Sequence, residues 1–363
     1  MSYIMKTLKK LLKLIFNRIF YIVFALLIQL GWLFFVVWRL AAYSKYISFG
    51  ITAISIASVL WILNKKINPS YKLGWTMLIL VFPVFGLLLY ILFGKSRIAQ
   101  KIQEHYAEIQ EESLPYMEQD PEVQRLITEE DLSAAVQSAY IRNYSGFPVH
   151  GNTTARYFQV GDDMFPALVA ELEQASHYIY IEYFIINDGV MWRTILDILE
   201  RKAAEGVDVR LIYDGFGCAT TLPNKYDRYL RKKGIQCKIF NPFKPILNIV
   251  QNNRDHRKIC VIDGKTGFTG GINLADEYIN QKERFGHWKD TAVMLKGEAV
   301  WNMTVMFLHM WSVVNGSREP VNYTEYMPHR YHPESFPHNG FVQPFSDTPL
   351  DGEVRSEEHT SEL

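Results

Sequence analysis

The chain has 363 residues, with 38 Lys or Arg and 38 Asp or Glu, so its formal net charge is zero. A length of this order suits about two ordinary domains. The charges are divided unevenly, because residues 1–101 hold thirteen basic residues and no acidic one, which leaves 25 basic and 38 acidic residues for the remainder. This division argues against one uniform soluble domain and predicts two parts in different surroundings.

Three long uncharged runs lie in the basic part, at residues 19–38, 46–64 and 73–94. Each is about long enough for a helix to cross ~30 Å of hydrocarbon. Aromatic residues stand near run ends, as interface anchors do: Trp32, Trp38, Trp61 and Tyr90. A buried core helix is the alternative for any one run, and the first run is too long for a cleaved signal peptide. We therefore predict a membrane region over residues 1–101 with three spans.

The basic residues that flank these runs give conflicting signals about orientation. By the positive-inside rule, the basic amino terminus and the loop with Lys65, Lys66 and Lys72 are cytoplasmic. Three spans would then place everything after Gly94 outside, yet Lys95 and the basic residues after it favour the inside. The sequence leaves the side of the membrane open.

An acidic stretch with two prolines follows, from about Gln103 to Asp131. Charge runs of this kind are usually solvated connectors, so residues 102–136 are predicted to be an acidic linker. Further along, Cys218, Cys237 and Cys260 are odd in number and lack metal-type spacing. They are expected to be small buried hydrophobes without a disulfide framework.

The remaining sequence alternates between helical and strand-like patterns. In chain order, these are a helix around residues 164–172, an apolar strand at 178–186, a helix from about 190 to 206, a strand at 207–211, a helix near 226–233, and strands at 235–240 and 258–262. Strands separated by helices of this length predict an α/β domain with a largely parallel or mixed sheet flanked by helices on both faces.

The most informative stretch spans residues 253–278 and reads NRDHRKICVIDGKTGFTGGINLADEY. Alternation along its strand points His256 and Lys258 to the same side. An imidazole can attack phosphorus or pass a proton, and an ammonium offsets the charge of the non-bridging oxygens. Each residue alone has an ordinary explanation, as a surface histidine or a solvated lysine. Together they predict phosphodiester chemistry without a metal or another cofactor.

The residues that follow extend this interpretation. Gly270 and Gly271 permit close backbone approach, and Asn273 can donate its amide hydrogens to another phosphate oxygen. The whole pattern, H-x-K-x4-D-x6-G-G-x-N, resembles the signature of the phospholipase D superfamily, in which the position of Gly271 is often Ser. The match is highly specific.

The resemblance extends to bacterial cardiolipin synthases and covers roughly residues 47–350. Residues 71–95 are similar to the amino-terminal membrane segment of that family, and YIYIEYFIINDG, VRLIYDGFG, IFNPFKP and HWKDTAVMLKGEAV resemble successive blocks of its first catalytic repeat. The resemblance implies a phospholipase D-like fold and transfer of a phosphatidyl group between two phosphatidylglycerol molecules, giving cardiolipin and glycerol.

The resemblance also implies residue roles. His256 would be one of two active-site histidines, of which one forms a phosphohistidine and the other protonates the departing glycerol. Lys258 and Asn273 would hold the phosphate, and Asp263 would support the catalytic motif. Glu182, in an apolar strand, is either a partner of an active-site histidine or a satisfied core carboxylate.

The sequence departs from the family in one respect: the family has two copies of the motif, and the second copy does not occur here. Residues 137–320 would be the first catalytic repeat, and 321–354 the start of a connection to a missing second repeat. The final residues 355–363, RSEEHTSEL, correspond to a translated sequencing adapter and are expected to be a non-native tail, with a natural short polar tail as the alternative. The chain is therefore expected to be a fragment that is inactive by itself.

The expected setting is a multi-pass protein of the bacterial plasma membrane. Its expected partners are phosphatidylglycerol and other anionic lipids, the bilayer and the missing repeat, and no nucleic acid. The loop from Asn241 to Arg254, which mixes apolar and basic residues, either lies on an anionic lipid surface or is an ordinary partly buried loop. The alternatives to a synthase are another membrane-bound phospholipase D or phosphatidyltransferase, and an inert lipid-binding partner of a complete synthase.

Overall fold

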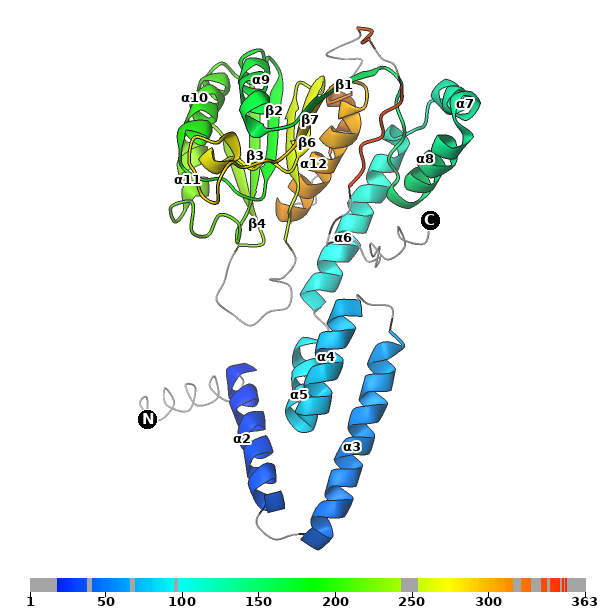
Figure 1. The fold of residues 1–363 in the computed structure, drawn as a ribbon, viewed down its shortest axis with the longest axis vertical. Helices are drawn as coiled ribbons and strands as arrows, with labels where there is room; N and C mark the ends of the chain where they lie inside the picture. The colour runs from blue at the N-terminus through cyan, green and yellow to red at the C-terminus, as the bar shows by residue number, and fades with distance from the viewer. Residues whose placement is uncertain are drawn as a thin grey trace, which may run out of the picture. The chain divides into compact units, whose positions relative to one another are not determined.

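The structure is a computed structural model that describes residues 18–37, 41–65, 69–94, 97–242, 254–315, 321–327, 334–337, 340–346, 348 and 350. The chain forms two compact units, and the boundary between them falls between Ile98 and Ala99 (Figure 1). Most of the Asn241–Arg254 loop, for which contact with lipid was predicted, lies outside the described residues.

The first unit consists of helices α2 (Arg18–Val37), α3 (Ala41–Leu63), α4 (Pro69–Val81) and α5 (Pro83–Phe93). In the described part of the chain, one segment, Lys45–Leu63 of α3, is long and apolar enough to cross a membrane by length and composition. The apolar segments of the other helices in this unit are shorter. One candidate span is therefore found where three were predicted.

The run over residues 73–94, for which a single span was predicted, is divided between α4, which has 13 residues and begins at Pro69, and α5, which has 11 residues. The break lies at Phe82, since Pro83 has no N–H and its ring obstructs a continuous helix. The rings of Trp75 on α4 and Tyr90 on α5 lie 5.3 Å apart, so the two helices fold back side by side (Figure 1). At about 1.5 Å per residue, 13 residues reach about 20 Å, which is too short to cross the hydrocarbon.

The second unit begins with the acidic stretch, which was predicted to be a solvated linker. It instead forms α6 (Arg97–Ser113), the 3₁₀ turn η1 (Leu114–Tyr116) and α7 (Pro121–Glu130), followed by α8 (Leu132–Ser145). Tyr106 and Ile109 of α6 are buried, and Tyr106 joins a core cluster together with residues of the last long helix. The charges cover the outer face of an amphipathic helix, so composition concealed the buried face.

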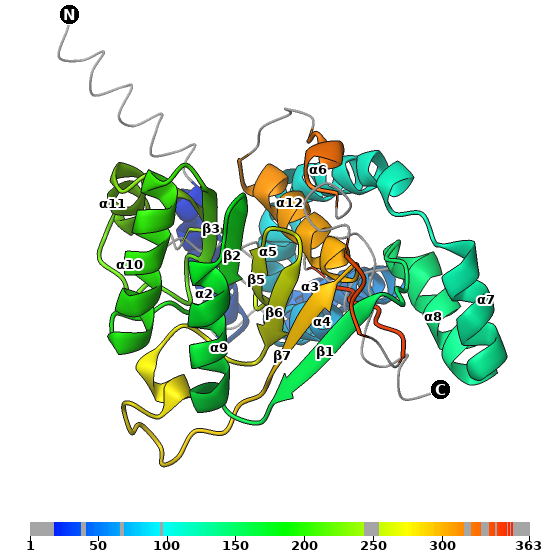
Figure 2. The same cartoon turned by 90° about the horizontal axis from the view of Figure 1, so that it is seen from above.

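A seven-stranded sheet forms the centre of the second unit, in the order β1-β7-β6-β5-β2-β3-β4 (Figure 2). The strands are β1 (Thr153–Phe158), β2 (Tyr178–Tyr183), β3 (Asp208–Asp214), β4 (Gln236–Phe240), β5 (Lys258–Ile262), β6 (Thr266–Gly270) and β7 (Ala292–Gly297). Strands β2, β3 and β4 are parallel, and every other pairing is antiparallel. The predicted mixed sheet is confirmed; β1, β6 and β7 were not predicted as strands.

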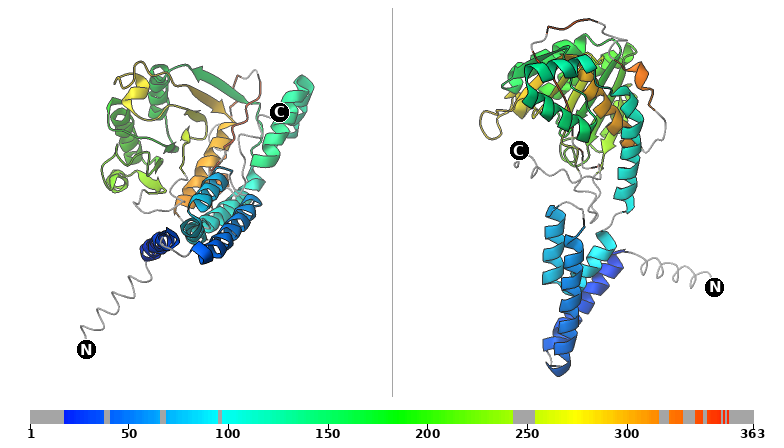
Figure 3. Two further views of the ribbon diagram at one scale, coloured as in Figure 1. Left: turned by 60° about the horizontal axis from the view of Figure 1, so that its bottom comes forward. Right: turned by 90° about the vertical axis from the view of Figure 1, so that its right-hand side faces the viewer.

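Helices cover both faces of this sheet, as Figures 2 and 3 show. On one face lie α9 (Gly161–Glu173), α10 (Val190–Ala204) and α11 (Tyr226–Lys232), and on the other lies α12 (Val300–Asn315). Two further 3₁₀ turns are η3 (Asp276–Ile279) and η4 (Tyr323–Glu325). The helices predicted around 164–172, 190–206 and 226–233 correspond to α9, α10 and α11.

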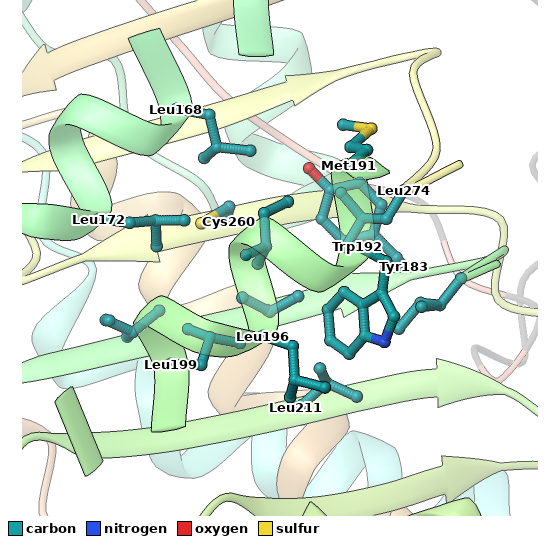
Figure 4. Packing of buried hydrophobic residues seen from close by; sticks show 14 of the residues in the cluster. Leu168, Leu172, Tyr183, Met191, Trp192, Leu196, Leu199, Leu211, Cys260 and Leu274 are labelled. Carbon is teal, nitrogen blue, oxygen red and sulfur yellow. The ribbon is translucent and has the colours of Figure 1, made fainter. Parts of the chain in front are cut away.

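The core on the α9–α10 face shows why these segments form a sheet with covering helices. Alternate strand residues such as Tyr183 and Leu211 point into this face and pack against Trp192 and Leu196 of α10 (Figure 4). The three cysteines are buried and free, and Cys260 lies in this cluster, as expected.

The strand directions bring several loops to the same edge of the sheet. Strands β2, β3, β4 and β6 end there, while β5 and β7 begin there, as the pairing registers require. We call this the His256 edge, because His256 immediately precedes β5. The opposite edge, where β5 ends, is called the Asp263 edge.

Candidate active site

His256 and Lys258 meet at the His256 edge. His256 is exposed, whereas the Lys258 side chain is only 4% exposed and reaches back along the loop. Lys258 Nζ donates to the backbone oxygen of His256 at 2.6 Å and lies 3.2 Å from Nδ1 of its ring. An ammonium has no lone pair, so Nδ1 must accept in this contact. The structure thus brings together the two residues that alternation predicted on one side.

The electrostatic setting lowers the pKa of both groups. Burial lowers the pKa of Lys258 to about 8, against the opposing influence of the Asp255 and Asp290 carboxylates. Burial and the neighbouring Lys258 charge also lower the pKa of His256 below its usual value. A neutral imidazole and a titratable ammonium therefore coexist near neutral pH, which suits a nucleophile or proton carrier beside a phosphate-binding cation.

Phe184, the first residue after β2, was missed by the sequence analysis. Its ring centroid lies 4.7 Å from that of the His256 imidazole and 5.5 Å from Lys258 Nζ. The ring therefore borders both groups and helps to exclude water from one side of the pair. An aromatic residue in an apolar strand gave no signal of this position.

Gly270 and Gly271 allow the backbone to pass close to neighbouring groups. Gly270 has a φ of +147°, and a Cβ there would lie 2.3 Å from the Thr291 backbone oxygen. A Cβ on Gly271 would lie 1.9 Å from Oδ1 of Asp290. The Asp290 carboxylate thus fills the space beside Gly271, and its charge raises the pKa of both His256 and Lys258. Asp290 is a second site residue that the sequence analysis missed.

Asn273 is buried and joins two loops of the same edge. Its Oδ1 accepts from the backbone N–H of Ile185 at 3.0 Å, and its Nδ2 donates to the Tyr278 hydroxyl at 2.8 Å. One amide hydrogen is thus already donated within the protein. The predicted contact between Asn273 and a phosphate oxygen would use the other and stays a prediction.

Asp263 lies at the opposite end of β5, about 16 Å from Lys258 at ~3.3 Å per residue. Its Oδ1 accepts from the backbone N–H groups of His177 and Tyr178, each at 2.8 Å. Its Oδ2 accepts from the backbone N–H and the hydroxyl of Ser176, at 2.8 and 3.0 Å. The structure therefore does not bring Asp263 to the predicted cluster: it joins the end of β5 to the start of β2.

One of the two sequence interpretations made Glu182 a partner of an active-site histidine. In the structure, Glu182 does not pair with His256. It is fully buried and forms an ion pair with Arg257, which also bonds Asp255 Oδ1 at 3.0 Å. Burial raises the pKa of Glu182 well above its usual value, with Asp255 adding to the shift and Arg257 opposing it. Asp255 and Arg257 flank His256 in the sequence, so this buried cluster fixes the loop from the face opposite Lys258.

Asp214, at the end of β3, fixes the same loop from a second direction. Its Oδ2 accepts from the backbone N–H of Asp255 at 3.2 Å, and its Oδ1 accepts from Phe216 and Gly217 at 2.7 and 2.8 Å. The His256 loop is thereby tied to the loop after β3. Across the part of the chain that the structure describes, no group of three or more His, Cys, Asp or Glu side chains could hold a metal ion.

Two family models match segments of this chain. Residues 168–311 match the family model described as cardiolipin synthase, phospholipase D-like domain, and residues 53–95 match the phospholipase D-nuclease N-terminal model. A cardiolipin synthase from Halalkalibacterium halodurans is 33% identical over 83% of this chain and 60% of its own length. Residues 168–311 therefore form a phospholipase D-like domain that belongs to the cardiolipin synthase family.

Two other proteins place this membership in context. An uncharacterized protein from Streptococcus mutans is 42% identical over 82% of this chain and 64% of its own length. Among solved structures, NucT from Helicobacter pylori is 17% identical, covers 44% of this chain and 97% of its own, and has a TM-score of 0.35. The chain thus spans 60% to 64% of the length of the two sequence relatives. The matched cardiolipin synthase domain includes every site residue described above.

Proposed function

We propose that the protein is a phosphatidyltransferase of the cardiolipin synthase type, and that this chain is the part with the membrane region and one of two half-sites. It would transfer a phosphatidyl group from one phosphatidylglycerol to another, giving cardiolipin and glycerol. The observation that carries the proposal is the buried Lys258 ammonium within 3.2 Å of the exposed His256 ring. This pair offers a nucleophile or acid beside a cation for the phosphate.

The first half of the reaction forms a bond between phosphorus and an imidazole nitrogen and breaks the bond between phosphorus and the glycerol oxygen. A second histidine, from the other half-site, is needed because the departing glycerol oxygen must receive a proton. In the second half, a hydroxyl of another phosphatidylglycerol attacks phosphorus, the P–N bond breaks, and the second histidine takes the hydroxyl proton. His256 takes one of these two roles.

Both roles use Nε2 of His256, because Nδ1 faces the Lys258 ammonium. A phosphate oxygen competes with Nδ1 for the Lys258 ammonium, since an anionic acceptor forms the stronger hydrogen bond. Once Lys258 turns to the phosphate, Nδ1 is released and can carry the ring hydrogen, which leaves a lone pair on Nε2 for attack. The ion pair between the Asp255 and Arg257 side chains holds the backbone of the intervening His256 in place while this exchange occurs.

Water must be kept from a phosphohistidine if a lipid alcohol is to be the acceptor. Phe184 beside the imidazole supports this function, because its ring shields one side of the His256–Lys258 pair. The apolar helices of the first unit support a membrane location, where lipid acceptors are concentrated.

Expression of the full-length gene in a strain that lacks cardiolipin tests the proposal. Total lipids are then separated and measured by mass spectrometry, with His256→Asn as the inactive control. Cardiolipin that appears only with the unaltered protein supports the transferase. Accumulation of phosphatidic acid instead indicates water as the acceptor, and an unchanged lipid profile favours the inert lipid-binding alternative.

A further inference from the structure

Exposed apolar side chains are distributed unevenly between the two edges of the sheet. At the His256 edge, Val190 at the start of α10, Phe216 after β3 and Phe285 between β6 and β7 are 57%, 55% and 81% exposed. At the Asp263 edge, the described loops 174–177, 205–207, 233–235, 263–265 and 298–299 carry no exposed large apolar side chain. The exposed apolar surface of these loops is therefore confined to the edge with the catalytic pair.

The loop with Phe285 also carries positive charge. Lys282, Arg284 and Lys289 are all exposed, with the acidic Glu283 between them, and Arg284 also forms an ion pair with the buried Glu277 at 3.1 Å. The Arg284 guanidinium lies 5.3 Å from the Phe285 ring centroid. An apolar tip surrounded by basic residues fits a bilayer surface that contains anionic lipid, because the ring can enter the interface while the cations meet headgroup phosphates.

Aromatic contacts connect this tip to the site. The Phe285 and Trp288 ring centroids lie 6.2 Å apart, and those of Trp288 and Tyr278 lie 5.0 Å apart. The Tyr278 hydroxyl accepts from Asn273 Nδ2 at 2.8 Å. The tip is thus supported by packed rings that end at a residue of the His256 edge.

We propose that the His256 edge docks on the surface of a bilayer rich in anionic lipid. Phe285, Phe216 and Val190 enter the interfacial layer, and the basic residues beside Phe285 contact the headgroups. This proposal rests on the proposed function in one respect, that the same edge takes its substrate from the bilayer. The occupant at Phe285, Phe216 and Val190 is a lipid surface, because isolated rings flanked by cations match headgroups and acyl chains better than a flat apolar partner. The second half-site of the proposed function would meet the His256–Lys258 pair itself.

A nitroxide attached through Phe285→Cys in the full chain tests the docking. The native Cys218, Cys237 and Cys260 are buried, so the introduced thiol reacts selectively. Two matched controls are Gln174→Cys at the Asp263 edge and Leu132→Cys on α8, where Leu132 is also apolar and 66% exposed. The chain is reconstituted in phosphatidylcholine vesicles with or without phosphatidylglycerol, and collision rates with oxygen and with a water-soluble nickel chelate are measured.

With phosphatidylglycerol present, we expect the label at 285 to gain at least twofold in its oxygen-to-nickel collision ratio over both controls, with a smaller gain in phosphatidylcholine. Equal nickel access at 285 and 174 overturns the proposal. Shielding at 285 that is the same in detergent and vesicles also overturns it, because a protein segment then covers the tip. This measurement does not depend on turnover. If the edge docks but the proposed function is wrong, the label at 285 shows docking while no cardiolipin is formed.

A second inference concerns α4 and α5 and stands on different observations. Lys65, just after α3, donates to the Tyr90 hydroxyl near the end of α5 at 2.6 Å. Lys72, in the first turn of α4, donates to the backbone oxygen of Leu63 at 3.0 Å. The end of α3, the start of α4 and the end of α5 therefore lie together.

We infer that α4 and α5 enter the membrane and return to the same side, as a hairpin. The basic residues before the hairpin and those after it, from Lys95 onward, then lie on one side, which the positive-inside rule makes cytoplasmic. This removes the conflict that three spans create. A hairpin of two short helices satisfies its own backbone hydrogen bonds, as a membrane requires.

Single cysteines in intact cells test this arrangement with a membrane-impermeant maleimide. We expect Lys72→Cys before the hairpin and Glu104→Cys on α6 to be protected alike until the cells are opened, and Lys45→Cys at the other end of α3 to react from outside. Opposite behaviour of positions 72 and 104 overturns the hairpin. Protection of position 45 together with the other two also overturns it, because α3 would then not cross.

Discussion

The two ends of strand β5 carry residues of one sequence motif in opposite circumstances. At the Asp263 edge, the carboxylate of Asp263 accepts four hydrogen bonds from Ser176, His177 and Tyr178. At the His256 edge, Lys258 is buried with His256 as its hydrogen-bond partner, and its pKa falls to about 8. Asp263 has its hydrogen-bond partners within the fold and stabilises it. The Lys258 ammonium forms no ion pair with the described residues and is available for a substrate anion.

The largest expected effect is at the end of β5 that carries His256. In the full-length enzyme, His256→Asn should lower kcat by at least ~10²-fold, because the variant can neither form the P–N bond nor transfer the proton. His177→Asn, an exposed histidine at the Asp263 edge, is the matched control and should retain activity. Initial rates of cardiolipin formation give the comparison. Near-normal turnover by His256→Asn would remove the functional distinction between the two ends.

Replacement of Lys258 should have the next largest effect. Lys258→Met should abolish most turnover with the protein still folded, because the phosphate loses its cation. In the unaltered enzyme, kcat/KM should fall as pH rises through about 8, the pKa to which burial lowers Lys258. On the acid side, the lowered pKa of His256 keeps the ring neutral to below its usual pH range.

Lys258→Arg sharpens the assignment of the alkaline limb. A guanidinium stays charged far above pH 8, so the fall in kcat/KM should move to higher pH whatever the variant's absolute rate. An alkaline limb that stays near pH 8 in Lys258→Arg would assign it to another group. Aggregation of Lys258→Met would instead indicate a structural role for the lysine.

At the other end of β5, Asp263→Ala should mainly affect stability. Loss of a charged acceptor for four donors should cost about 1.5–3 kcal/mol of unfolding free energy. The midpoint of thermal unfolding in detergent measures this loss, and Asp263→Asn, which keeps one acceptor oxygen, should lose less. The pH profile of the remaining folded enzyme should stay unchanged. A selective loss of kcat with normal stability would contradict the structural assignment.

A smaller effect is expected from Gly271→Ala. Its methyl group would displace Asp290, whose carboxylate raises the pKa of Lys258. The alkaline limb should then move to lower pH by less than about one unit. Gly151→Ala is the control, because its Cβ would meet Val123 at an ordinary 3.6 Å. An unchanged limb in Gly271→Ala would mean that Asp290 does not act on the pair.

The smallest expected effect is that of a chelator. His256, Lys258 and Asn273 supply an imidazole, an ammonium and an amide, which can bind and transfer phosphate without a divalent ion. Activity of the full-length enzyme should therefore change by less than about twofold in EDTA, which corresponds to about 0.4 kcal/mol of activation free energy. If EDTA abolishes activity and Mg²⁺ or Zn²⁺ restores it, catalysis at the His256 edge requires a metal ion and the prediction is contradicted.

Local pattern determined much of this protein. The period of apolar residues predicted α9, α10 and α11, because one face of each helix must be buried. Strand alternation placed His256 and Lys258 on one side, because successive side chains point in opposite directions. The burial of the three free cysteines followed from their apolar surroundings.

Only the tertiary structure decided the partners of these residues. Asp263 is five positions from Lys258 in the sequence, yet an extended strand carries it to the opposite edge of the sheet. Asp290 and Phe184 reach the catalytic pair from loops that are distant in the sequence, and Arg257 takes the partner that was considered for His256. Composition likewise could not reveal that α6 is buried on one face or that the run over 73–94 folds back at Pro83. These features depend on contacts between segments far apart in the chain, and the sequence pattern records only what each segment requires locally.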